Sequence, residues 1–229
     1  MLVDGSSELE ITHVCEVAAR VTGTTGAGIM LMAGDVARGS LGTTDRTSAT
    51  IEELQFALGE GPCVDAYQSD ARIDEPDLAH PAVPRWLAFA GSAVDAGAAA
   101  VFCFPLHLGG VRLGALDLYR TTPGPLSDDE AADAVELADI ATRAVLVLQA
   151  DAAPGRLAAE LEAGSYLQLV VHQATGMIAA QLDVGVAQAL ISLRAYAFGN
   201  ERPLAEVAAD VVERRVRFGP PRDLAAVAP

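Results

Sequence analysis

Three cysteines are the residues of this sequence whose side chains could do nucleophilic, redox or metal chemistry. Cys15, Cys63 and Cys103 lie far apart, and they form no Cys-x-x-Cys pair and no Cys/His spacing typical of a zinc site. A thiol reacts as its thiolate, and no basic residue stands beside Cys63 to stabilise that form. The sequence therefore predicts reduced thiols of a cytoplasmic protein, with no metal and no cofactor.

Signatures of catalysis, secretion and membrane insertion are missing from the sequence. The histidines are scattered, and no Walker loop, HExxH or GxSxG motif occurs. Residues 1–10 are acidic and polar, unlike a signal peptide. The uncharged run from Ala96 to Val111 contains Pro105 and His107 and favours a buried strand over a membrane span. We expect a cytoplasmic protein that is neither an enzyme nor bound to membranes.

The charge of the chain is concentrated in its first two thirds. The 229 residues carry 31 acidic and 15 basic side chains, the basic ones all arginine, for a formal net charge of −16. Residues 1–155 hold 23 acids and 8 arginines (net −15), and residues 156–229 hold 8 acids and 7 arginines (net −1). Such acidity excludes a non-specific DNA coater and disfavours anionic membranes. The nearly neutral second part remains compatible with a small RNA-binding module.

The pattern of residues 1–150 predicts an α+β domain in which helices pack on an antiparallel sheet. The expected elements are a helix over 9–21, a hairpin over 27–41, a helix from Thr50 with Glu53 three residues on, a short helix from Pro62, a helix face at Trp86, Phe89 and Ala93, a hairpin over 99–119 turning at Gly109-Gly110, and a helix over 127–150. The first helix is expected to bury Val14, Val17, Ala18 and Val21 on one face. Ser127 and Glu130 form a predicted capping box before the last helix.

Three local phrases of this part resemble the GAF family of small-molecule-binding sensor domains. They are Gly59-Glu60-Gly61-Pro62-Cys63, Pro84-Arg85-Trp86, and the run from Pro105-Leu106 to Leu113-Gly114-Ala115-Leu116. The resemblance covers about residues 6–150. It implies a pocket between the sheet and the connecting helices, lined by Cys63, Trp86, Cys103 and Tyr119, although some relatives use the domain only to dimerise. No cluster of charged residues in the sequence indicates which ligand fits.

The pattern of residues 156–218 predicts three short helices, after a linker at 151–155 and before a flexible tail at 219–229. The first helix, from residue 156 or 157 to 181, carries Leu167, Val171, Ala174 and Ile178 at alternating spacings of four and three. That spacing is typical of a coiled-coil seam and favours pairing with a second subunit. The second helix is expected over 186–197, and the third from Pro203 to about residue 216.

Three phrases of these helices resemble the ANTAR family of RNA-binding antitermination modules. They are Gln173-Ala174-Thr175-Gly176-Met177-Ile178, Ala189-Leu190-x-x-Leu193-Arg194-x-x-Ala197, and Asn200-x-Arg202-x-Leu204-x-x-Val207-Ala208. The resemblance covers about residues 160–213 and implies recognition of RNA loops, where arginine binds phosphate or stacks on bases. The RNA-binding residues that it implies, with the basic residues just beyond it, are Gln173, Thr175, Arg194, Arg202, Arg214, Arg215 and Arg217.

This chain departs from the ANTAR pattern at two positions. The family usually has lysine where this chain has Thr175, and arginine where it has Gln168. The segment from Glu160 to Val212 also holds only two arginines against six acids. The sequence therefore predicts RNA binding that is weak, dependent on a dimer and strongly sensitive to salt.

The sequence leaves three hypotheses about function. The leading one is a bacterial, signal-responsive antitermination regulator that binds paired hairpin loops of nascent RNA as a homodimer. The enzyme alternative is a GAF-fold reductase of free methionine sulfoxide that uses Cys63 and Cys103. The third is a protein whose terminal helices only dimerise or interact, because their RNA surface has been lost.

Overall fold

The chain divides into two structural units, residues 1–161 and residues 162–229, and each unit is described by itself. The computed structural model describes residues 5–33, 36–151, 166–200 and 202–219. All of the predicted linker except Asp151, and all of the predicted tail except Gly219, lie outside the described residues.

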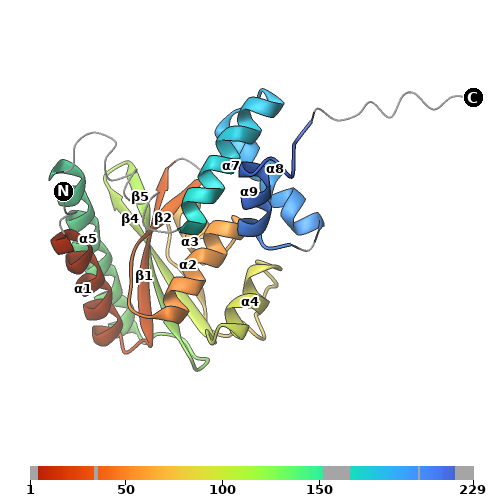
Figure 1. The fold of residues 1–229 in the computed structure, drawn as a ribbon. Helices are drawn as coiled ribbons and strands as arrows, with labels where there is room; N and C mark the ends of the chain where they lie inside the picture. The colour runs from red at the N-terminus through yellow and green to blue at the C-terminus, as the bar shows by residue number, and fades with distance from the viewer. Residues whose placement is uncertain (1–4, 34–35, 152–165, 201, 220–229) are drawn as a thin grey trace, which may run out of the picture. The chain divides into compact units, whose positions relative to one another are not determined.

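The first unit is built on an antiparallel sheet, as the sequence predicts, and it has five strands, one more than the two predicted hairpins supply (Figure 1). The strands are β1 (Gly26–Ala33), β2 (Val36–Thr43), β3 (Ile73–Glu75), β4 (Ala100–Leu108) and β5 (Val111–Arg120), in the spatial order β2-β1-β5-β4-β3. Gly109 and Gly110 connect β4 to β5, and Gly109 has a φ of 60°, which glycine adopts without steric cost. The central strands are therefore β1, β5 and β4.

Two helices, α1 (Gly5–Val21) and α5 (Asp128–Asp151), cover one face of the sheet side by side (Figure 1). Their apolar side chains share one cluster with alternate strand residues such as Phe102 and Leu116. This cluster is the larger part of the core, and it takes up one of the two faces that the alternation of each strand creates.

The buried face of α1 differs from the predicted one. Ile11, Cys15 and Ala18 are buried against the sheet and α5, whereas Val21 is 46% exposed. Val14 and Val17 pack only at the edge of the cluster. The helical period is correct, but the face is rotated, because apolar spacing alone does not say which of two overlapping stripes meets the sheet.

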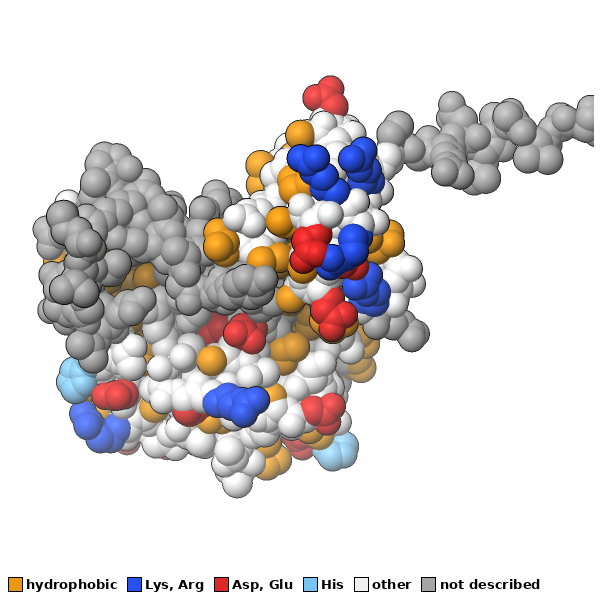
Figure 2. Space-filling view, viewed as in Figure 1, with side chains coloured by type: hydrophobic (Ala, Val, Ile, Leu, Met, Phe, Trp, Pro, Cys, Tyr) orange, Lys and Arg blue, Asp and Glu red, His pale blue; other side chains and the backbone are white. Residues whose placement is uncertain are grey.

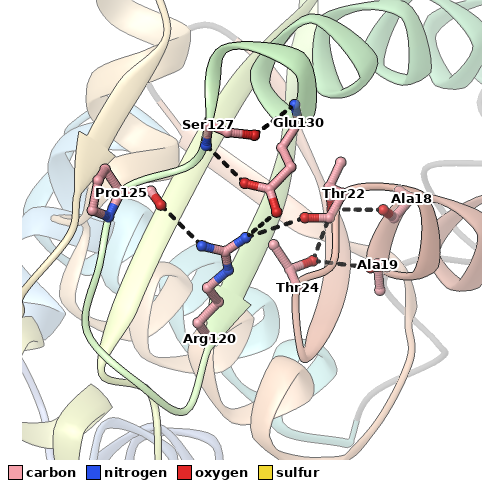
Figure 3. Close-up of polar contacts among 8 residues, drawn as sticks. All are labelled: Ala18, Ala19, Thr22, Thr24, Arg120, Pro125, Ser127 and Glu130. Carbon is pink, nitrogen blue, oxygen red and sulfur yellow. Dashed lines mark hydrogen bonds and ion pairs between the residues drawn. The ribbon is translucent and has the colours of Figure 1, made fainter.

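The N-terminus of α5 carries the capping box that the sequence predicts (Figure 3). The Ser127 N–H donates to Glu130 Oε2 at 2.7 Å, and the Glu130 N–H donates to Ser127 Oγ at 3.2 Å. Arg120, the last residue of β5, donates to Glu130 Oε1 (2.8 Å), to the Thr22 carbonyl (3.3 Å) and to the Pro125 carbonyl (2.9 Å). One guanidinium thus joins the end of β5, the end of α1 and the first turn of α5.

Three helices pack on the opposite face: α2 (Arg46–Leu58), α3 (Pro62–Ser69) and α4 (Phe89–Asp95) (Figure 1). The predicted helix start at Thr50 is four residues late. Asp45 is the N-cap, because its carboxylate accepts from the Ser48 N–H at 2.8 Å and the Ser48 hydroxyl meets the Asp45 N–H at 3.0 Å. Pro62 occupies the first turn of α3, as predicted.

The second unit contains α7 (Tyr166–Leu182), α8 (Val186–Gly199) and α9 (Leu204–Val212), which pack on one another. The third helix ends earlier than predicted, and the first ten residues predicted for the first helix lie outside the described residues. Val171, Ala174 and Ile178 of the predicted coiled-coil seam are completely buried within the chain. The seam is therefore not a free surface for a partner helix, because the same spacing serves packing inside the chain equally well.

Within the described ranges, no single helix is long and apolar enough to cross a membrane. Leu169–Leu182 and Val186–Gly199 reach that length and composition only when taken together, and the pair is bent by 105° at the break between them.

Candidate functional site

A row of three residues crosses the centre of the sheet in the first unit. Gly28 on β1 lies opposite Asp117 on β5, and Asp117 lies opposite Cys103 on β4. Leu116 and Leu118, the neighbours of Asp117, pack with α1 and α5 on one face, so Asp117 projects to the face that carries α2 and α3. A carboxyl and a thiol are thereby placed side by side in the interior.

Glu52 on α2 brings a second carboxyl over this row. The absence of a side chain at Gly28 makes room for it, since a Cβ at Gly28 would lie 2.3 Å from Glu52 Oε1. Glu52 is 1% exposed, neither of its carboxylate oxygens accepts from an N–H or hydroxyl donor among the described residues, and its hydrogen-bonding neighbour is the Asp117 carboxyl. Burying a polar group without a partner is unfavourable, so this position needs an explanation beyond stability.

Gln55, one helical turn after Glu52, connects the row to α3. Its side-chain amide donates to Asp117 Oδ2 at 3.1 Å, and its carbonyl oxygen accepts from the Cys63 N–H at 2.7 Å. The other oxygen of Asp117 accepts from the Cys103 thiol. Glu52, Gln55, Cys63, Cys103 and Asp117 thus form one buried polar group, called here the Asp117 cluster.

Burial dominates the electrostatics of the Asp117 cluster. It raises the pKa of Glu52 well above its ordinary value, and the neighbouring charge of Asp117 raises it further. Burial also raises the pKa of Asp117, although hydrogen bonds with Glu52, Cys103 and Gln55 oppose the effect. Two carboxyls that are buried together in this way do not both ionise readily, so the cluster holds at least one proton near neutral pH.

A small hollow opens beside the cluster and is the candidate ligand pocket. It is lined by Gly28, Ser48, Ile51, Glu52, Val101, Asp117, Leu118 and Tyr119, which fill it so closely that no water-sized space remains. The Tyr119 hydroxyl donates to Asp45 Oδ2 at 3.0 Å. Burial, followed by Asp45, raises the pKa of Tyr119 to about 12, so the phenol is neutral and can act as a hydrogen-bond donor.

The predicted RNA-binding residues of α7 differ in their exposure. Gln173 is exposed on the surface of α7. Thr175 is only 1% exposed, and its hydroxyl donates to the Val171 carbonyl one turn earlier at 2.7 Å. The structure therefore places Thr175 on the buried face of the helix, where it presents no group to RNA. The threonine satisfies its own hydroxyl locally, as this residue often does within helices.

The predicted arginines gather mainly around α9. Arg202 precedes the helix and Arg215 follows it, yet both donate to Asp210, at 2.7 Å and 2.6 Å. Arg214 and Arg217 are exposed beside them, and Figure 2 shows basic and acidic side chains mixed on this face of the second unit. Arg194 on α8 differs from these arginines, because its guanidinium is mostly buried and burial lowers its pKa to about 10.

The segment after α9 is held in place on the second unit. The Phe218 N–H donates to Gln181 Oε1 on α7 at 2.8 Å, and the Phe218 ring lies 5.3 Å from the Tyr196 ring on α8. The segment that carries Arg214, Arg215 and Arg217 is therefore held at one end by contacts with Asp210 and at the other end by the contacts of Phe218.

Comparison with known proteins decides the family. The GAF domain family model matches residues 8–145. This chain belongs to the GAF family. It is a signalling or sensor domain protein, and GAF domains bind small-molecule ligands. No curated protein sequence matches the chain significantly.

Solved structures show the same fold for the GAF domain. A domain of a two-component sensor histidine kinase protein from Sinorhizobium meliloti superposes with a TM-score of 0.50 at 18% identity, over 62% of this chain and 93% of that chain. The type II free methionine-R-sulfoxide reductase from Thermoplasma acidophilum superposes with a TM-score of 0.50 at 16% identity, over 61% and 92%. At these identities the likeness concerns the fold alone.

The four predicted pocket residues of the GAF domain fall into two groups. Cys63 and Cys103 meet in the Asp117 cluster, and Tyr119 lines the hollow beside it. Trp86 belongs to a neighbouring apolar cluster with Phe89 and does not line the hollow. It precedes α4, with a left-handed φ of 53°, and its indole N–H donates to Asp65 at 2.9 Å. The predicted helix face through Trp86 is therefore wrong, because the helix begins only at Phe89.

Sequence reasoning missed the two carboxyls that give the GAF pocket its chemistry. Asp117 lies in the predicted hairpin over 99–119 and Glu52 in the helix predicted from Thr50, and neither is among the predicted site residues. The available signal was an acid flanked by Leu116 and Leu118 in a buried strand, and an acid beside Ile51 in an amphipathic helix. An acid at an apolar position indicates a functional site or a paired charge.

The buried thiols of the GAF domain bear on the reductase alternative. Burial raises the pKa of both Cys63 and Cys103, and the charge of Asp117 raises each further. A reactive cysteine needs a lowered pKa, which basic neighbours or a helix N-terminus favour; Cys63 lies in the first turn of α3, but burial and Asp117 outweigh that position. The Asp117 cluster therefore disfavours the thiolate that such a reduction requires.

Proposed function

We propose that this protein is a bacterial, signal-responsive regulator of transcription antitermination. Its GAF domain binds a small-molecule signal, and its three-helix unit binds paired hairpin loops of nascent RNA as a homodimer. The protein acts in the cytoplasm and uses no catalytic step. Antitermination by this route is a choice between RNA folds, so binding energy for one fold is sufficient to shift the populations.

One observation carries the RNA assignment: Asp210 draws Arg202 and Arg215 together from opposite ends of α9. Arg214 and Arg217 are exposed next to them, so four guanidinium groups lie in one part of the second unit. Guanidinium groups bind phosphate in a bidentate manner and stack on unpaired bases. The RNA assignment is also supported by the ANTAR resemblance, whose three sequence phrases fall on α7, α8 and the start of α9.

The acids around α9 set a limit on this surface. Asp210 neutralises part of the charge of Arg202 and Arg215, and Arg202 also approaches Glu206 at 3.8 Å. Arg214 and Arg217 make no ion pair with any residue that the structure describes, and they are the cations most available to phosphate. With so few contacts per chain, the proposal requires two chains on two adjacent hairpins, and binding that weakens steeply as salt rises.

The decisive experiment measures binding of the full chain to a labelled transcript that holds two adjacent hairpins. The double variant Arg214→Ala/Arg217→Ala should weaken binding and reduce the steepness of its dependence on salt by roughly one to two phosphate contacts. Arg143→Ala, which removes an exposed arginine of α5 in the GAF domain, is the matched control and should change neither. Absent binding, or equal effects of the two changes, contradicts the proposal.

A second candidate function is association with another protein chain through the helical unit alone. Val186, Ile191 and Phe198 of α8 are 58%, 55% and 75% exposed, and Ile191 and Phe198, seven residues apart, lie on the same side of the helix. Phe198→Ser separates the two candidates. If self-association is lost and no hairpin RNA binds either protein, the helical unit is an association module; if RNA binding persists, the regulator is favoured.

A further inference from the structure

The strongest unexplained feature of the molecule is the Glu52 carboxyl. It is buried at the centre of the GAF domain, it borders the hollow, and neither of its oxygens accepts from an N–H or hydroxyl donor among the described residues; its hydrogen-bonding neighbour is the Asp117 carboxyl. Asp117, by contrast, also receives the Gln55 amide and the Cys103 thiol. Apart from a proton shared with Asp117, the acceptor positions of Glu52 therefore have no donor within the described residues.

The hollow has acids but no bases. Glu52 and Asp117 contribute two carboxyls, and the six other lining residues include no lysine, arginine or histidine. The remaining walls are mainly aliphatic or aromatic, from Ile51, Val101 and Tyr119, and Ser48 adds one hydroxyl. A site with this composition is complementary to a positive charge that is carried on a small apolar body.

The chemistry of the acids narrows the kind of cation. The described residues contain no group of three or more His, Cys, Asp or Glu side chains that could hold a metal ion. Two carboxyls with free acceptor positions instead suit a cation that carries N–H donors, because each N–H supplies both charge and a hydrogen bond. An ammonium or an amidinium meets this requirement, whereas a quaternary ammonium, which has no N–H, does not.

We propose that Glu52 and Asp117 recognise a small organic cation with N–H donors, a primary ammonium or an amidinium on a short apolar body. This inference rests on the proposed function of the GAF domain as a small-molecule sensor and names the class of its ligand. The hollow has no water-sized space, so the ligand enters only when lining side chains move.

Binding of such a cation requires ionised carboxyls, so it releases protons that the cluster holds. The titratable groups on the same side of the sheet as Glu52 are Asp117 and Tyr119 on β5, Cys63 on α3 and Cys103 on β4, and Cys15 on α1 interacts with the charge of Glu52 from the opposite side. None of them is basic. The cation is therefore the group that allows Glu52 and Asp117 to be charged at the same time.

The test uses the full chain and four probes, measured by calorimetry and by the fluorescence of Trp86, the single tryptophan. Isobutylammonium and benzamidinium are expected to bind. Isobutanol, a neutral relative of similar shape, and tetramethylammonium, a cation without N–H donors, are expected to bind at least about tenfold more weakly. Equal binding of isobutanol, or no saturable binding of either N–H cation, overturns the inference.

Two variants assign the binding to the pocket. Glu52→Gln keeps the shape of the side chain and is expected to weaken isobutylammonium binding by at least about tenfold, whereas Glu53→Gln, its exposed neighbour on α2, changes it less than about twofold. Equal effects of the two changes overturn the inference. Hairpin RNA binding is measured on the same proteins without probe. If RNA binds but no cation binds, only the present inference fails. If cations bind but RNA does not, only the RNA assignment fails.

Discussion

The Arg120 guanidinium and the Glu130 carboxylate, 2.8 Å apart, fasten the last residue of β5 to the first turn of α5 (Figure 3). Three residues earlier on the same strand, Asp117 forms the floor of the candidate pocket. The strand that carries the pocket chemistry is thus bonded directly to the helix that leaves the GAF domain. A displacement of β5 on ligand binding would reach α5 through this ion pair, which is a short and contiguous path.

The capping role of Glu130 predicts a loss of stability when its charge is removed. The hydrogen bond from the Ser127 backbone, together with Arg120, lowers the pKa of Glu130 in the folded chain. The ionised Glu130 therefore stabilises the fold above the unfolded pKa of about 4.3, and this stabilisation is lost as pH falls through the lower folded pKa. Glu130→Gln should lower the melting temperature at pH 7 by roughly 2–4 °C and leave it nearly unchanged near pH 3. Asp129→Asn is the control, because it removes an exposed charge from the same helical turn. Equal effects of the two changes at pH 7 would contradict the assigned role.

The carboxyls of the Asp117 cluster predict the opposite dependence on pH. The folded chain binds protons at Glu52 and Asp117 more tightly than the unfolded chain, because both pKa values are raised. Stability from this source is therefore greatest at low pH and declines as pH rises above about 4.3 through the folded values. Glu52→Gln should remove part of that decline, so the variant gains stability relative to the wild type between pH 5 and pH 8. Urea denaturation at both pH values checks this, with Glu53→Gln as the control that should show no such trend.

The antiparallel sheet was predictable because its signals are local. Gly109-Gly110 between two alternating apolar runs predicts a hairpin, and the Ser127–Glu130 capping box indicates where α5 begins. The start of α2 was missed because Asp45 and Ser48 cap it without the expected glutamate at the third position, and Thr50 offered a more familiar pattern.

The pocket was only half predictable because its chemistry arises from pairing between distant segments. Cys63 and Cys103 stand out by type, and both do reach Asp117. Glu52 joins them only because β1 places Gly28 beside Asp117, and no spacing in the sequence reveals that register. In the second unit, the stripe through Val171 and Ile178 could not distinguish a partner helix from a neighbour in the same chain.

The raised pKa values of the thiols predict slow alkylation in the folded protein. Cys63 and Cys103 are buried beside Asp117, and burial raises the pKa of Cys15 to about 12, so none of the three forms a thiolate readily near neutral pH. Iodoacetamide at pH 7.5 should modify them far more slowly in the native chain than in the urea-unfolded chain. Rapid native modification of Cys63, or turnover of free methionine sulfoxide, would instead restore the reductase alternative.

The contrast between Gln173 and Thr175 predicts which residues of α7 RNA can reach. Gln173 is exposed and could read a base edge or a sugar hydroxyl, whereas the Thr175 hydroxyl is buried and bonded to its own helix. Gln173→Ala should weaken hairpin binding by roughly two- to tenfold, the cost of one hydrogen bond. Thr175→Val, which keeps the shape and removes only the hydroxyl, should leave affinity unchanged. Fluorescence anisotropy with the two-hairpin transcript measures both, and an effect of Thr175→Val as large as that of Gln173→Ala would mean that the buried face of α7 opens when RNA binds.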